Sequence, residues 1–120
     1  MTINLTAMLK IYHNPRCGKS REGLEILEKS GKEYEVVLYM DQPPSVEELR
    51  DLIQKLGISP IDLVRKNERI WKEQFKGKRL SDASILKAMV EHPKLIERPI
   101  VVQGGKALIG RPPILIKTLL

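Results

Sequence analysis

Cysteine is nearly absent from this sequence, which has one, Cys17, among its 120 residues. A single thiol cannot build an internal disulfide framework, so small disulfide-stabilised secreted domains are excluded. It also cannot supply the several thiolates of a zinc ribbon. If Cys17 is reactive, the thiol that resolves its intermediate must therefore come from another molecule.

Aromatic residues are scarce as well, at 4% of the chain. The net charge of +6 favours anionic partners, and nucleic acids and small oxyanions both meet that description. The basic residues, however, are dispersed among acidic ones and form no arm, and there are too few aromatics for a base-stacking platform. We therefore expect no nucleic-acid partner.

Long apolar runs are missing too. No stretch approaches the about 18 consecutive apolar residues of a membrane span, and residues 1–8 lack the basic start of an export signal. We expect a cytoplasmic protein without membrane contact, bound metal or resident cofactor. The chain is long enough for one core, so residues 1–120 are expected to form a single domain, with a monomer as the default state.

The apolar pattern predicts an α/β fold in which a β-α-β unit is followed by helices and then by β-β-α. A strand at 9–12, a helix at 20–29 and a buried strand at 34–40 form the first, parallel unit. The remaining predictions are helices at 46–56, 60–64, 68–74 and from 81 or 82 to 91, strands at 99–103 and 106–109 joined by Gly104-Gly105, and a helix at 112–120.

Cys17 falls at the predicted junction between the first strand and the first helix. Unpaired amides and the positive end of the helix dipole favour a thiolate there, and Arg16, Lys19 and Arg21 add positive charge. Together they predict a pKa below that of a free cysteine. The alternative is a small buried side chain, for which a position among three basic residues is unfavourable.

Two phosphate-binding motifs are incomplete around this cysteine. The segment Gly18-Lys19-Ser20 is similar to the end of a P-loop, but His13 stands where the motif needs its first glycine. A cysteine phosphatase loop would carry an arginine where this chain has Gly23, and Arg21 is expected to point away from the loop. Any grip on an oxyanion must therefore come from arginines distant in sequence.

Three arginines are candidates: Arg65 ends the middle helical block, Arg98 precedes Pro99, and Arg111 follows the last strand. The planar guanidinium suits oxyanions because it donates two parallel, charge-assisted hydrogen bonds. Arg98 and Arg111 flank one hairpin, so both reach Cys17 if that hairpin pairs beside the first strand. Taken singly, each arginine is more often a solvated surface charge.

Over residues 9–120 these segments together resemble the glutaredoxin-coupled arsenate reductase family of the ArsC type. The matching segments are Ile11 to Arg21, Tyr39 to Pro44, Leu63 to Asn67, His92-Pro93 and Arg98 to Val102. The resemblance implies a thioredoxin-like fold with a mixed sheet and a helical insertion at about residues 45–95.

The same resemblance implies roles for individual residues. Cys17 is the nucleophile, and the oxyanion-binding arginines are Arg65, Arg98 and Arg111. Pro99 matches the cis-proline that faces the active cysteine. His13 matches a histidine near the thiol, although an ordinary strand-end imidazole is an equal alternative. Ser20 occupies the position of the second thiol in C-x-x-C.

The implied activity is the reduction of arsenate to arsenite by a monothiol enzyme. Glutathione would be the co-substrate that adds after Cys17, and glutaredoxin would accept the mixed disulfide, because Ser20 supplies no thiol. One alternative is a family thiol oxidoreductase with another substrate, in keeping with the basic Arg16 and Lys19. Another is a Spx-like regulator that binds RNA polymerase, although that group typically carries C-x-x-C.

Overall fold

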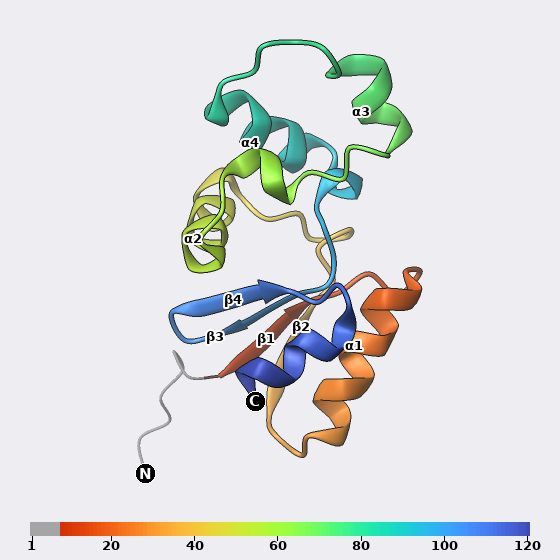
Figure 1. The fold of residues 1–120 in the computed structure, drawn as a ribbon, viewed down its shortest axis with the longest axis vertical. Helices are drawn as coiled ribbons and strands as arrows, with labels where there is room; N and C mark the ends of the chain where they lie inside the picture. Colours follow the sequence, from red (N-terminus) through yellow and green to blue (C-terminus); the bar gives the residue numbers. More distant parts are fainter. Residues whose placement is uncertain (1–7) are drawn as a thin grey trace. The chain divides into compact units, whose positions relative to one another are not determined.

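The computed structural model describes residues 8–120, which divide into two compact units (Figure 1). One unit comprises the chain up to Gln42 together with Arg98–Leu120, and the other comprises Pro43–Glu97. Within the described range no helix is long and apolar enough to cross a membrane. The expectation of no export signal concerns residues that lie almost entirely outside this range, and the single domain over 1–120 stays a prediction.

The first unit is built on a four-stranded sheet with the order β2-β1-β3-β4. Strand β1 (Leu9–Tyr12) pairs parallel with β2 (Tyr34–Val37) and antiparallel with β3 (Ile100–Gln103). β3 in turn pairs antiparallel with β4 (Lys106–Ile109). The predicted α/β, thioredoxin-like fold is confirmed, including the parallel β-α-β unit. β2, however, ends earlier than predicted, and it is not buried: it lies at the edge of the sheet, where Val36 is 39% exposed.

Helix α1 (Gly18–Lys29) and the C-terminal 3₁₀ helix η4 (Pro113–Leu119) pack together against this sheet. Alternate residues of β1 point to the same face, where they meet apolar side chains of the two helices. The resulting core cluster consists of Leu9, Ile11, Leu27, Val101 and Ile116. α1 begins at Gly18 rather than at Ser20, so Cys17 is its N-cap residue.

The hairpin of β3 and β4 turns at Gly104-Gly105, as predicted. Gly104 has a φ of 59°, in the left-handed region that glycine adopts without steric cost. At the other end the pairing continues past the strands, because the Gly110 N–H donates to the Pro99 carbonyl at 2.8 Å. The hairpin therefore fixes the segments that carry Arg98 and Arg111 side by side.

The second unit is helical, in keeping with the predicted insertion. Its elements are α2 (Val46–Leu56), η2 (Pro60–Leu63), α3 (Arg69–Gln74), α4 (Asp82–Glu91) and η3 (Pro93–Leu95). Serine caps begin α2 and α4, the two longest helices of this unit: Ser45 Oγ accepts from the Glu48 N–H at 3.1 Å, and Ser81 Oγ accepts from the Ser84 N–H at 3.2 Å. Gly57, at a φ of 69°, ends α2.

Gly110 provides a test of packing at the end of the sheet that carries Arg98 and Arg111. A Cβ atom added there would lie 2.9 Å from Ile116 Cδ1 and 3.0 Å from Pro99 Cγ. We predict that Gly110→Ala lowers the free energy of unfolding by about 1–3 kcal/mol in urea denaturation, because the buried neighbours must shift. Gly105→Ala is the control, since its Cβ would meet nothing within 4 Å. Equal losses in both variants would contradict the packing argument.

Candidate active site

The sheet register brings the predicted site residues of the first unit to one end of the sheet. Tyr12, the last residue of β1, pairs with Ile100, the first residue of β3. Ile100 in turn pairs with Ile109, the last residue of β4. The loop that carries Cys17 therefore starts beside the segments that carry Arg98 and Arg111.

Asn14 shapes the loop that leads to the cysteine. Its backbone carbonyl accepts a hydrogen bond from the Cys17 N–H at 3.0 Å, and its side-chain oxygen accepts one from the Arg16 N–H, also at 3.0 Å. Asn14 is buried, so these bonds are shielded from water. The sequence predicts a turn at Asn14-Pro15, but it did not predict that Asn14 organises the loop. The signal for this role was an asparagine directly before a proline, because asparagine side chains often hydrogen-bond nearby backbone groups in turns.

Ser20 joins this loop to helix α1. Its side chain is fully buried, and its Oγ lies 2.7 Å from His13 Nδ1 and accepts the Asn14 N–H at 2.9 Å. In the sequence, Ser20 was interpreted only as the residue at the position of a second thiol in C-x-x-C. Its hydroxyl instead holds the start of the loop against the first turn of the helix, a contact that depends on tertiary structure.

The pKa of Cys17 lies below its ordinary value. Partial burial is the largest single influence and acts to raise the pKa, but several groups that favour the thiolate outweigh it. In order of size these are a hydrogen bond from the Ser20 backbone, one from the Arg98 side chain, one from the Lys19 backbone, and the Arg98 charge. No acidic residue stands in the first turn of α1 to oppose them. The lowered pKa predicted from sequence is confirmed in direction.

His13 is buried at the end of β1, and its pKa is lowered chiefly by burial. Hydrogen bonding at Ser20 acts in the opposite direction, and the positive charge of Arg21 lowers the pKa further. The neutral ring is therefore favoured near neutral pH. In either tautomer the His13 ring forms one hydrogen bond with the Ser20 hydroxyl.

The two hairpin arginines are linked. The Arg98 side chain interacts with Cys17, and Arg111 Nη1 donates to the Arg98 carbonyl at 3.2 Å. The expectation that both lie at neighbouring strand ends is confirmed. Arg65 belongs to the second unit, where its Nε lies 3.3 Å from Glu68 Oε1. The oxyanion-binding role of these three arginines stays a prediction.

Pro99 follows a cis peptide bond, as the resemblance implied. The Arg111–Pro112 bond is also cis, which was not predicted. Arg21 differs from expectation: its Nη1 donates to the Pro15 carbonyl at 3.0 Å instead of pointing away from the loop. The prediction was wrong because a long helical side chain leans toward the N-terminus, where it can reach the preceding loop.

This arrangement suits nucleophilic chemistry on an anion. A thiolate is the reactive form of cysteine, and the guanidinium beside it can hold an anionic substrate while favouring that form. Among residues 8–120 no three side chains of His, Cys, Asp or Glu lie together as potential metal ligands.

Removing the Arg98 guanidinium should raise the pKa of Cys17. Arg98→Ala loses both a hydrogen-bond donor to the thiolate and a nearby positive charge. We expect the half-maximal rate of iodoacetamide alkylation to move to higher pH by about one unit. Arg111→Ala is the control, because Arg111 is not among the groups that lower the pKa of Cys17. If Arg98→Ala leaves the pH dependence of alkylation unchanged, Arg98 does not lower the pKa of Cys17.

Removing the Ser20 hydroxyl should destabilise the fold. Ser20→Ala leaves the Asn14 N–H and the His13 ring without a partner in a buried position. We expect a loss of about 1–3 kcal/mol in the free energy of unfolding, measured with urea. Ser84→Ala, at an exposed position of α4, should change stability by less than about 0.5 kcal/mol. A Ser20→Ala protein as stable as the Ser84→Ala control would argue against this network.

Comparison with known proteins agrees with this geometry. The model of the ArsC family matches residues 12–119. A protein of Escherichia coli K12 called uncharacterized protein YfgD is 51% identical over 111 residues, which cover 91% of this chain and 93% of that protein. An arsenate reductase of Neisseria meningitidis serogroup B is 45% identical over 106 residues, covering 87% and 91%.

A solved structure, an arsenate reductase from Vibrio cholerae, superposes with a TM-score of 0.90 at 47% identity and covers 95% of this chain and 98% of that one. The family model extends over nearly the same residues as the resemblance found in the sequence, 9–120. The shared region includes the cysteine loop, the hairpin and both of its flanking arginines. The protein therefore belongs to the ArsC family.

Proposed function

We propose that this protein reduces arsenate to arsenite, with Cys17 as the nucleophile and glutathione and glutaredoxin as the source of electrons. The observation that carries the proposal is the position of Cys17 at the start of α1, with a lowered pKa and the Arg98 side chain beside it. The relatives named arsenate reductase, at 45% identity over most of the chain, support the choice of substrate.

The first step forms a bond between sulfur and arsenic. The Cys17 thiolate attacks arsenic(V) of bound arsenate, one arsenic–oxygen bond breaks, and the oxygen leaves as water after taking up protons from solution. Arg98 and Arg111, at the adjacent hairpin ends, would hold the oxyanion and stabilise the charge on the leaving oxygen.

The second step supplies the electrons. A glutathione thiolate attacks Cys17 Sγ, the sulfur–arsenic bond breaks, and its electron pair remains on arsenic, which departs as arsenite. The two thiols are thereby oxidised to a mixed disulfide while arsenic gains two electrons. Glutaredoxin then attacks the glutathione sulfur and releases the Cys17 thiolate.

An external thiol is required because Cys17 is the sole cysteine of the chain. Ser20, at the position of a possible second thiol, is a buried hydroxyl already engaged by His13 and Asn14. An internal disulfide therefore cannot form. This distinguishes the proposed reaction from one in which a second cysteine of the same chain resolves the adduct.

A second candidate is the same thiol chemistry on a different substrate. The YfgD relative, at 51% identity, has no activity in its name and is more similar to this chain than the arsenate reductases at 45%. The exposed Arg16 and Lys19 give this cysteine loop extra positive charge. Fold and nucleophile alone do not determine the substrate.

A coupled assay tests the first candidate. We expect NADPH oxidation that depends on arsenate when the protein is combined with glutathione, glutaredoxin and glutathione reductase. Cys17→Ser should abolish it, and Arg98→Ala should lower kcat/KM for arsenate by about a hundred-fold, because an oxyanion donor is lost. Ser84→Ala, at an exposed position of α4 in the other unit, is the control and should leave kcat/KM unchanged. A folded wild-type protein with a low thiol pKa and no arsenate-dependent turnover would favour the second candidate.

A further inference from the structure

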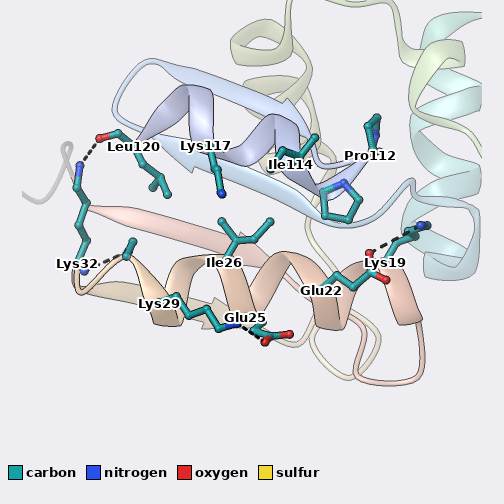
Figure 2. Close-up of a pocket in the computed structure, with 12 residues that line it drawn as sticks. Lys19, Glu22, Glu25, Ile26, Lys29, Lys32, Pro112, Ile114, Lys117 and Leu120 are labelled. Atoms are coloured by element: carbon teal, nitrogen blue, oxygen red, sulfur yellow. Dashed lines mark hydrogen bonds and ion pairs between the residues drawn. The ribbon is translucent and has the colours of Figure 1, made fainter.

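A groove of about 900 Å³ lies between α1 and η4, wholly within the first unit (Figure 2). Lys19 and Pro112 stand at one end of it, and Lys32 and Leu120 stand at the other. It thus follows the whole of α1, whose 12 residues span roughly 18 Å. An extended tripeptide such as glutathione covers only roughly 10 Å, so the groove is long enough for a polypeptide segment.

The floor of the groove is apolar. Ile26 projects from α1 toward η4, and Ile114 of η4 also lines the groove. Ile114 is 55% exposed, although an isoleucine is usually buried. An exposed isoleucine inside a groove, rather than on a convex surface, is typical of a position that a partner covers.

The walls carry an excess of positive charge. Three of the four lysines that line it have partners: Lys29 Nζ lies 2.8 Å from Glu25, Lys19 Nζ lies 3.7 Å from Glu22, and Lys32 Nζ donates to the Leu120 backbone oxygen at 2.5 Å. Lys117, on the opposite wall, forms no ion pair with any residue of the described range 8–120. A fitting partner therefore presents an apolar side chain with a carboxylate next to it.

The near end of the groove adjoins the reactive cysteine. Lys19 is two residues from Cys17 in the first turn of α1, and Pro112 follows Arg111 directly. A protein that brings a thiol to Cys17 must cover this turn. The groove continues from there, so such a partner can extend into it without leaving the site.

We propose that this groove is the docking surface for the thiol-bearing protein that regenerates Cys17. The inference rests on the proposed function, because that function leaves Cys17 joined to glutathione. In the docked pair the partner's thiolate attacks the glutathione sulfur, a new disulfide forms between partner and glutathione, and the bond to Cys17 breaks to release its thiolate. The partner's apolar side chain meets Ile114, and its carboxylate meets Lys117.

The test isolates this last step from arsenate chemistry. The mixed disulfide of Cys17 is prepared with oxidised glutathione, and its reduction is followed with a bacterial glutaredoxin and, separately, with dithiothreitol. Ile114→Glu should lower kcat/KM for glutaredoxin about ten-fold or more, because it removes the apolar contact and repels the carboxylate. Lys117→Glu should act in the same direction. The rate with dithiothreitol should not change.

Leu115→Glu is the matched control. Leu115 neighbours Ile114 on η4 and is 41% exposed, but it does not line the groove. It should change the glutaredoxin rate by less than about two-fold. Thermal unfolding of all three variants checks that each is folded. We expect all of them to fold, because the substituted positions are exposed.

Several results would overturn the proposal. One is a glutaredoxin rate that falls equally in Ile114→Glu and Leu115→Glu, or that does not fall at all in Ile114→Glu. Another is a rate with dithiothreitol that falls as much as the rate with glutaredoxin. The last is that glutaredoxin reduces the wild-type mixed disulfide no faster than dithiothreitol does. A dimer in sedimentation that Ile114→Glu dissociates would assign the groove to a second copy of this chain. Since the assay contains no arsenate, absence of arsenate turnover refutes the proposed function separately.

Discussion

The hydroxyl of Ser20 holds the cysteine loop against helix α1, and the position of the thiol depends on it. The Oγ atom accepts the Asn14 N–H and contacts His13, while the Asn14 carbonyl accepts the Cys17 N–H. The Ser20 backbone in turn hydrogen-bonds the cysteine and lowers its pKa. One buried residue thus connects the end of β1, the loop and the helix that stabilises the thiolate. A cysteine at this position would supply a resolving thiol, but it would lose the hydrogen bonds that the Ser20 hydroxyl forms with Asn14 and His13.

The sheet provides the second half of the site. Because β3 runs antiparallel to β1, the segment that enters β3 lies where the cysteine loop leaves β1. The hairpin then brings the end of β4 to the same place, so residues far apart in sequence become neighbours. Pro99 fits there because Gly23 and Gly110 leave room for its ring and for Ile116. The glycines on α1 and after β4 therefore serve packing around the site.

Local signals in the sequence were enough to predict most of the elements. Serine caps before α2 and α4, Gly57 after α2, and the two glycines of the hairpin each determine a boundary through contacts within a few residues. The position of Cys17 at a helix start and of three arginines at element ends made them candidates, and the resemblance supplied their roles. The roles of Asn14 and Ser20 and the turn of Arg21 toward Pro15 depend on how a loop folds onto a helix, which periodicity and propensity do not encode.

The influences that activate Cys17 serve both halves of the proposed cycle. Arg98 and the backbone of α1 lower the pKa of Cys17, so more of it is thiolate at a given pH than in a free cysteine, which favours attack on arsenic. The same stabilisation makes Cys17 a good leaving group when a disulfide to it is cleaved. The incoming protein thiol should then attack the glutathione sulfur and displace Cys17, the N-cap residue of α1, so the partner must reach the start of this helix. A docking surface beside that start serves this approach.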